Sequence, residues 1–131
     1  TDTIWGGNGG DSLFGGSDND TVYGDAGDDT LWSDSGSDKM YGGDNNDIFW
    51  QTTNDDASDW MYGGNGDDKL WVSMNGFGTD TFDGGAGNDT LYLNDTALNF
   101  TYTYTTTTSG IVTFDDGSVL YFTGVENIML Y

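Results

Sequence analysis

The chain has very few basic residues and no histidine, cysteine or arginine. Its 131 residues include two lysines and 23 acidic side chains, which gives a formal net charge of −21 at pH 7. This charge argues against a nucleic-acid partner, because phosphate binding requires basic side chains. The absence of cysteine fits a chain that meets changing redox conditions. No apolar run approaches the length of a membrane helix, and Thr1 begins in the middle of a repeat without a signal segment.

The same absences remove most of the usual catalytic groups. All acidic residues except Glu126 are aspartates, and a glycosidase pair would have to be chosen among them without a cleft to guide the choice. Lys39 and Lys69 fall on strand positions expected to face outward, so neither is placed as the base of a lyase. We therefore expect that the chain is not an enzyme.

A conventional hydrophobic core is not expected either. Only 34% of the residues are hydrophobic and 22 are glycine, and the carboxylates repel one another unless cations neutralise them. Intrinsic disorder is the alternative for such a composition. The aromatic content of 15% and the regular spacing of apolar residues argue against disorder when cations are bound.

A nine-residue repeat organises most of the chain. Aspartate recurs every nine residues, with two spacings of twelve, at positions 2, 11, 20, 29, 38, 47, 59, 68, 80 and 89. Each aspartate ends a turn that is mostly rich in glycine and precedes a short apolar segment, as in GDAGDDTLW from Gly24 and GGNGDDKLW from Gly63. Three-residue insertions at Gln51–Thr53 and Val72–Met74 produce the two longer spacings. A turn-plus-strand unit of fixed length predicts a solenoid.

The units resemble the nonapeptide GGxGxDxUx, with U apolar, of the RTX (repeats-in-toxin) family. The resemblance covers Thr1–Tyr92. It implies an all-β fold, namely a right-handed parallel β-roll with two sheets of short strands, capped by antiparallel hairpin strands. In such a roll the first six residues of a unit form a turn and the last three form a strand. Two units make one coil, and calcium binds between a turn and the turn two units later.

This arrangement stacks the turns along two edges of the roll. The first edge contains the uninterrupted turns Gly6–Asp11, Gly24–Asp29, Gly42–Asp47, Gly63–Asp68 and Gly84–Asp89. The gaps between them are expected to hold about four calcium ions. The second edge contains Gly15–Asp20, Ser33–Asp38 and the expanded turns Gln51–Asp59 and Val72–Asp80. One or two ions are expected there, near Asp20 and Asp38, with altered gaps beside the insertions.

The residue types of the turns suit calcium. The ion takes six to eight oxygen ligands at about 2.3–2.6 Å, and a tight turn with inward carbonyls supplies several of them. Such turns need positive φ angles, which glycine permits and which asparagine or aspartate tolerates at Asp18, Asp25, Asp34 and Asn45. The alternative is that the aspartates only cap turns.

The resemblance assigns ligands position by position. The implied carboxylate ligands are Asp11, Asp20, Asp29, Asp38, Asp47, Asp68 and Asp89, with Asp59 and Asp80 beside the insertions. The other implied metal-site positions are the turn residues Gly7, Gly9, Gly27, Gly43, Asn45, Gly64, Gly66, Gly85 and Gly87.

The strands are expected to bury one residue per unit. Because strand side chains alternate between faces, the eighth position points inward, at Ile4, Leu13, Val22, Leu31, Met40, Phe49, Met61, Leu70, Phe82 and Leu91. The mostly aromatic ninth position points outward and forms two ladders, Phe14, Trp32, Trp50, Trp71 and Tyr92 on one sheet and Trp5, Tyr23, Tyr41 and Tyr62 on the other. These rings either stabilise the sheets alone or form a face for a polysaccharide, another copy of the chain or a neighbouring domain.

The repeat stops after residue 92, which divides the chain into a roll (1–92) and a capping segment (93–131) of the same structural domain. The alternating sequence LNFTYTYTTTT predicts a strand with one solvated face. The turn Asp115–Gly117 lies between two apolar runs and predicts a hairpin. The segment Ile111–Tyr131 resembles the β segment that covers the open end of RTX rolls. Its last residues, Glu126–Tyr131, are weakly similar to a type I export signal.

The favoured hypothesis is a secreted module that folds on calcium outside the cell, at a bacterial surface or in the medium, and acts as a structural or adhesive scaffold. One alternative is a self-assembling subunit of extracellular fibres. Another is a carbohydrate-binding module that uses the exposed aromatic ladder.

Overall fold

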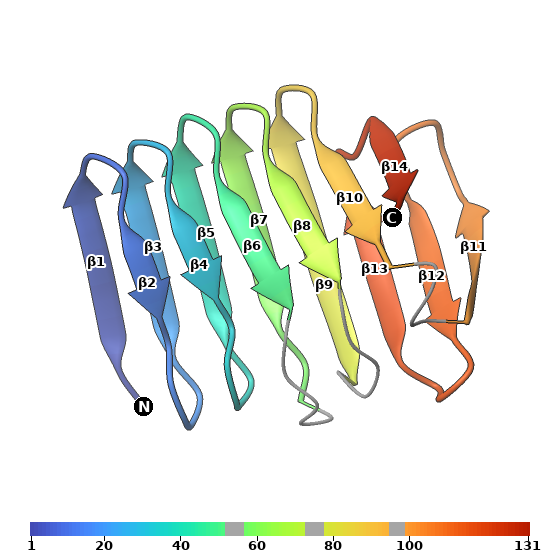
Figure 1. Ribbon diagram of the computed structural model, residues 1–131, viewed down its shortest axis with the longest axis horizontal. Helices are drawn as coiled ribbons and strands as arrows, with labels where there is room; N and C mark the ends of the chain where they lie inside the picture. The colour runs from blue at the N-terminus through green and yellow to red at the C-terminus, as the bar shows by residue number, and fades with distance from the viewer. Residues whose placement is uncertain (52–56, 73–77, 95–98) are drawn as a thin grey trace.

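The computed structural model describes residues 1–51, 57–72, 78–94 and 99–131. The regular structure in these residues is β, arranged as two sheets that face each other (Figure 1). The roll part of the first sheet contains β1 (Thr3–Asn8), β3 (Thr21–Ala26), β5 (Lys39–Asp44), β7 (Trp60–Asn65) and β9 (Thr79–Ala86). The roll part of the second contains β2 (Ser12–Phe14), β4 (Thr30–Trp32), β6 (Ile48–Gln51), β8 (Lys69–Val72) and β10 (Thr90–Leu93).

Successive strands alternate between the two sheets, and neighbours within a sheet run parallel. Val22 lies opposite Ile4 on one side and Met40 on the other. Paired residues are therefore two units apart, and the same holds across the insertions, where Met40 lies opposite Met61. The predicted all-β fold, a parallel β-roll with two sheets, is confirmed.

The eighth-position side chains fill the space between the sheets. Leu31, Met40 and Phe49 are completely shielded from solvent. Ile4, at the first coil, is partly buried and packs against the same cluster. The core along the roll is narrow, because each strand contributes only one or two inward side chains. The predicted inward positions are confirmed.

The strands of the first sheet are longer than expected. A three-residue strand was predicted for every unit, and β2 and β4 have that length, whereas β1, β3, β5 and β7 have six residues. The reason is that pairing continues into the turns, where Gly9 N donates to Ala26 O at 2.7 Å and Gly27 N donates to Asp44 O at 3.1 Å. Turns of equal length stack closely enough for these bonds. On the second edge, within the described residues, the turns form one isolated bridge, between Ser17 and Ser35.

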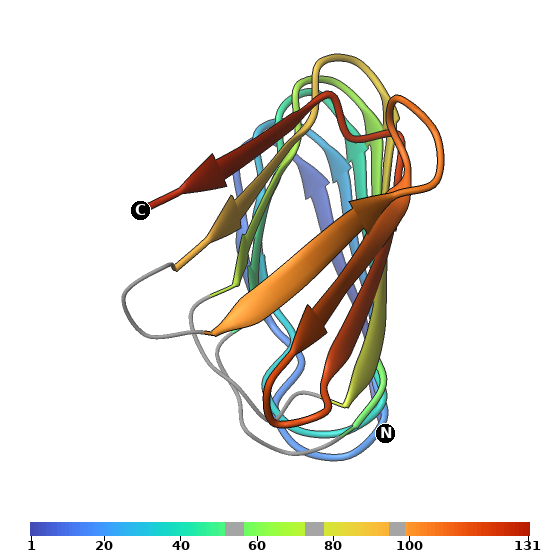
Figure 2. The ribbon, with the colours of Figure 1, turned by 90° about the vertical axis from the view of Figure 1, so that its right-hand side faces the viewer.

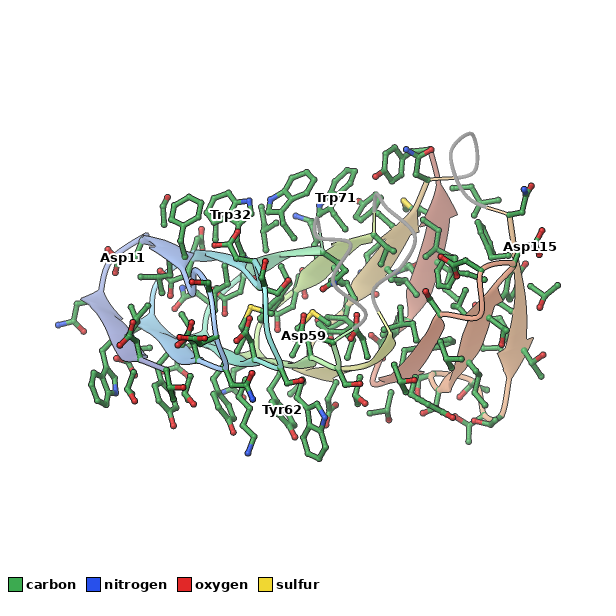
Figure 3. All side chains as sticks on the ribbon, turned by 90° about the horizontal axis from the view of Figure 1, so that it is seen from below. Asp11, Trp32, Asp59, Tyr62, Trp71 and Asp115 are labelled. Atoms are coloured by element: carbon green, nitrogen blue, oxygen red, sulfur yellow. The ribbon has the colours of Figure 1, made fainter. Side chains whose placement is uncertain are left out.

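The two predicted aromatic ladders form on opposite sheets, with one break between Trp32 and Trp50, which are paired in register but are not stacked. Figure 3 shows Trp32 and Trp71 projecting from one sheet and Tyr62 from the other. The stacked pairs are Phe14–Trp32, Trp50–Trp71 and Trp71–Tyr92 on one sheet, and Trp5–Tyr23, Tyr23–Tyr41 and Tyr41–Tyr62 on the other. Their ring centroids lie 4.0–5.9 Å apart, with interplanar angles of 3–18°. Within these six pairs the rings therefore lie face to face.

The C-terminal segment closes one end of the roll. β11 (Phe100–Tyr104), β12 (Gly110–Phe114) and β13 (Val119–Thr123) are antiparallel neighbours, and β12 and β13 make the predicted hairpin. β13 then pairs in parallel with β9, so the first sheet continues into the cap. Figure 2, viewed toward this end, shows the three strands lying across it. Their buried side chains extend the core and include Val112, Phe114, Leu120 and Phe122.

β11 is more exposed than its sequence pattern predicted. Tyr102 and Tyr104 are 50% and 47% exposed, and only Phe100 of this strand packs against the core. β11 is the outermost strand of the first sheet, whereas the second sheet extends only one strand beyond β10. Neither face of β11 is therefore covered by a facing sheet.

The last strand was not predicted. β14 (Asn127–Leu130) pairs in parallel with β10 and places Ile128 opposite Leu91. β13, the connection Gly124–Glu126 and β14 thus form one further coil of the roll. The role of these residues in export stays a prediction, as does the division of the chain at residue 92. In the part of the chain that the structure describes, no helix has the length and apolar character needed to cross a membrane.

The ladder geometry predicts unequal costs for two tryptophan substitutions. Trp71 stacks on both Trp50 and Tyr92, so Trp71→Ala should destabilise the calcium-loaded chain by about 1–3 kcal/mol. Trp60 is 48% exposed, and Lys39 Nζ lies 5.8 Å from the centroid of its ring. Trp60→Ala should therefore lower the free energy of unfolding by less than about 1 kcal/mol. Chemical denaturation in calcium measures both, and equal losses would contradict a stabilising role for the stack.

Candidate metal centre

The turns adopt backbone conformations that few residue types tolerate. Positive φ angles occur at the predicted metal-site positions Gly7, Gly9, Gly27, Gly43, Asn45, Gly64, Gly66, Gly85 and Gly87. Among the described residues, the non-glycine residues with positive φ are the four expected ones, namely Asp18 (81°), Asp25 (72°), Asp34 (56°) and Asn45 (83°). The conformations inferred from the residue types are confirmed at these positions.

The aspartate that closes each turn lies inside the roll. Asp29, Asp47, Asp68 and Asp89 are at most 1% exposed. Their Oδ1 atoms accept hydrogen bonds from the backbone N–H of the closing aspartate two units earlier, for example from Asp11 to Asp29 at 2.7 Å and from Asp47 to Asp68 at 2.8 Å. The same bond recurs along both edges. Each carboxylate is therefore held in one orientation.

The second carboxylate oxygen, Oδ2, is buried without a hydrogen-bond donor at several of these residues. They are Asp11, Asp20, Asp29, Asp47, Asp68 and Asp89. Burying an ionised oxygen without a partner is strongly unfavourable. A cation beside each of these oxygens would supply the missing partner.

The first residue of each first-edge turn marks the space for such a cation. A methyl group added to Gly6 would lie 2.7 Å from the carbonyl oxygen of Gly24 and 2.8 Å from Asp11 Oδ2. The equivalent spaces occur beside Gly24, Gly42, Gly63 and Gly84. Each is approached by Oδ2 of the same turn and by a carbonyl oxygen of the next coil. Two oxygens thus converge on a space that glycine keeps open.

The donor set suits calcium. All converging atoms are oxygens, the ligand type that Ca²⁺ prefers. Within the described residues, no three carboxylates gather in one metal-binding group, so an ion here would depend on backbone carbonyls in addition to the closing aspartate. Because these atoms come from two coils, they meet only when the turns are stacked. Ion binding and coil stacking are therefore coupled.

The second edge is less uniform. Beside Gly15 the corresponding space is wider, 3.3 Å from Ser33 O and 3.5 Å from Asp20 Oδ2. Ser33 occupies the first position of the following turn, which is glycine in every turn of the first edge. Asp59 and Asp80 are buried (Figure 3 labels Asp59 between the sheets). The predicted altered gaps involve residues 52–56 and 73–77, which lie outside the described residues.

Burial changes the acidity of the first-edge aspartates. It raises the pKa of Asp47 to about 7 and that of Asp68 to about 6, and it also raises the pKa values of Asp29 and Asp89. Loss of hydration is the main cause, because it disfavours the charged form. The hydrogen bond from the backbone acts in the opposite direction, and neighbouring carboxylates add to the increase.

A second ladder on the exposed side of the first edge was not anticipated. Asp28 Oδ1 accepts from Asn46 N at 3.0 Å, Asn46 Oδ1 from Asp67 N at 2.7 Å, and Asp67 Oδ1 from Asn88 N at 2.9 Å. These residues share the fifth position of their units, where an Asx side chain recurs. The first-position glycines were also not singled out as lining the metal site, although their recurrence was visible.

Sequence comparison shows the family of these repeats. A family model for the RTX calcium-binding nonapeptide repeat matches four times, at residues 1–31, 14–49, 54–72 and 75–96. The chain therefore belongs to this family and is a calcium-binding repeat module. No curated protein matches the chain. The assignment of individual ligands and the number of ions stay predictions.

Filling one gap should remove one ion. Gly42→Ala places a Cβ between Asp47 Oδ2 and the Gly63 carbonyl oxygen, so we expect the loss of one calcium ion, measured by isothermal titration calorimetry. The control is Gly117→Ala, where φ is +97° and no atom lies within 4 Å of the added Cβ. This change should cost about 1 kcal/mol through backbone strain without losing an ion. Unchanged calcium binding by Gly42→Ala would contradict the proposed position.

The pKa shifts predict a pH dependence for the metal-free chain. Asp47 binds a proton more tightly in the roll, with a pKa of about 7, than at its ordinary value of 3.8. The stabilisation by that proton is complete below about pH 4 and is lost as the pH rises through about 7. Chelator-treated protein should therefore gain β structure by circular dichroism as the pH falls from 7.5 to 5, above the isoelectric point of about 4.1. Increasing order with rising pH would contradict this assignment.

Proposed function

We propose that the chain is a secreted structural module that stays loosely folded at intracellular calcium levels and folds when it meets extracellular calcium. The observation that carries this proposal is the buried Oδ2 atom without a donor, repeated at Asp29, Asp47 and Asp68. A polypeptide that needs an ion in every coil is stable only where that ion is abundant.

The charge of the chain supports the same mechanism. At a net charge of −21, repulsion between coils opposes stacking until cations neutralise it. A thousandfold rise in free calcium stabilises a folded chain by up to about 4.1 kcal/mol per site. Four such sites would contribute up to about 16 kcal/mol, which is comparable with the whole stability of an ordinary domain, about 5–15 kcal/mol. A thousandfold rise in free calcium on leaving the cell would therefore be sufficient to drive folding.

The aromatic ladders support a structural role more than a sugar-binding one. Sugars stack on the faces of aromatic rings, and most ring faces within the ladders are covered by a neighbouring ring at 4.0–5.9 Å, with the step between Trp32 and Trp50 as the exception. Trp5 and Phe14, the first rings of the two ladders, are 64% and 55% exposed. Adhesion or self-association through the ladders would therefore rely on ring edges or on these first rings.

We also propose that the module is not catalytic. The closing carboxylates are committed to backbone hydrogen bonds and to the proposed ion spaces. The described residues form no pocket that would enclose a substrate. A scaffold role accounts for the buried aspartates and does not require a substrate pocket.

Calcium titration with a matched pair of variants tests this function. Circular dichroism should show a disordered chain in excess chelator and a β-rich chain in millimolar calcium, whereas magnesium should be much less effective because it demands smaller, octahedral sites. Asp47→Asn should raise the calcium concentration at the folding midpoint, and Asp115→Asn, in the exposed hairpin turn (labelled in Figure 3), should not. A wild-type spectrum unaffected by chelator would overturn the proposal.

A further inference from the structure

Each closing aspartate on the first edge faces the gap on its C-terminal side. Asp11 Oδ2 lies beside the space approached by Gly24 O, and Asp29 Oδ2 lies beside the space approached by Gly42 O. Five closing aspartates therefore face five gaps, whereas the five turns recognised in the sequence enclose only four. The fifth gap is the one beyond Asp89.

The cap occupies the far side of that gap. The space beside Gly84 is approached by Asp89 Oδ2 and by the carbonyl oxygen of Gly124. Gly124 has a φ of +63°, and a Cβ there would lie only 2.8 Å from Gly85 N. Gly124 thus takes the place that Gly24, Gly42, Gly63 and Gly84 take in the other gaps.

Glu126 takes the place of the next closing aspartate. Its Oε2 accepts a hydrogen bond from Asp89 N at 2.8 Å, as Asp89 Oδ1 does from Asp68 N at 2.7 Å. Asn127 Nδ2 donates to Asn88 Oδ1 at 3.1 Å, which continues the exposed ladder onto the cap.

The register explains why a glutamate is needed here. Thr123 lies opposite Asp83 and Asn127 lies opposite Thr90. The connection between the two strands of the cap therefore has three residues, 124–126, whereas the preceding turn uses six residues, 84–89, between the paired positions. The additional methylene of Glu126 offsets part of the backbone that is missing, so its carboxylate still reaches the Asp89 amide.

Asp89 supplies an independent sign of a ligand. Its side chain is completely shielded from solvent, and its Oδ2 has no hydrogen-bond donor. The cap shields Asp89 Oδ2 from solvent but donates no hydrogen bond to it. A capping contact that served only to exclude water would leave a buried charge uncompensated.

We propose that the cap completes a fifth calcium site on the first edge, between the turn Gly84–Asp89 and the connection Gly124–Glu126. Asp89 Oδ2 and the Gly124 carbonyl oxygen are ligands, and Glu126 positions the Asp89 backbone. The inference rests on the proposed calcium-dependent function and adds a site where the nonapeptide motif is absent. The ion joins the cap to the last repeat.

Diffraction from the full chain crystallised in calcium locates the ions directly. Anomalous difference peaks are expected in the four gaps between recognised turns and also between Asp89 Oδ2 and Gly124 O. Peaks in the four internal gaps with none beside Gly124 would overturn the fifth site and leave the proposed function standing. Peaks in no gap would overturn both.

Variants of Glu126 test the site in solution. Glu126→Ala removes the acceptor of the Asp89 N–H, so one calcium ion should bind about tenfold more weakly while the others are unchanged. Glu126→Gln keeps an acceptor oxygen and should restore part of that affinity. Asp115→Asn, in the turn at the opposite end of β13 from the connection Gly124–Glu126, is the control for Glu126→Gln.

Hydrogen exchange localises the effect of these variants. Calcium should protect the amides of β14 in the wild-type chain, and Glu126→Ala should lose this protection at a calcium concentration that still protects β3–β8. Wild-type affinity at every site together with undiminished protection of β14 in Glu126→Ala would overturn the assignment of Glu126. A wild-type chain that binds no calcium would contradict the proposed function itself.

Discussion

The structure depends on one constraint, which is that a carboxylate oxygen is buried without a donor in nearly every coil. The narrow core cannot offset this cost, because each strand contributes only one or two inward side chains such as Leu31 or Phe49. Hydrogen bonds to Oδ1 fix the direction of the carboxylate but leave its charge uncompensated. In the function that we propose, cation binding is therefore a condition for stacking of the coils, and the other features of the roll position the ion.

The two edges of the roll differ in structure: the first has uniform turns, and the second contains the two insertions. The first edge keeps turns of equal length, whose backbones hydrogen-bond from coil to coil and whose first glycines leave equivalent spaces. The second edge accommodates both insertions. The bond from Asp38 N to Asp59 Oδ1 at 2.9 Å spans an insertion and matches the uninterrupted bonds. The aspartate ladder and the strand register thus remain intact across both insertions.

The repeating part of the fold was predictable from sequence because each position has one physical role. Alternation in a strand predicts that Met40 is buried and Tyr41 is not, and intolerance of positive φ explains glycine, aspartate or asparagine at positions such as Asp25 and Asn45. The space beside the first glycines was not predictable in this way, because it arises between coils. β14 was missed because its connection is shorter and ends in Glu126, so the nine-residue period no longer marks it.

The cap combines parallel strands, β13 and β14, with antiparallel strands, β11 and β12, because it must cover both strand edges and a buried carboxylate at the end of the roll. The end of a parallel roll exposes two strand edges that would otherwise recruit further strands. β13 pairs with β9 and β14 pairs with β10, so both edges are covered by strands that continue the parallel register. The antiparallel strands β12 and β11 then extend only the first sheet. The end also leaves Asp89 Oδ2 facing a gap, which pairing of strands alone cannot satisfy. The connection Gly124–Glu126, which resembles a repeat turn, joins the two strands and, in the fifth site that we propose, also completes the surroundings of an ion beside Asp89 Oδ2.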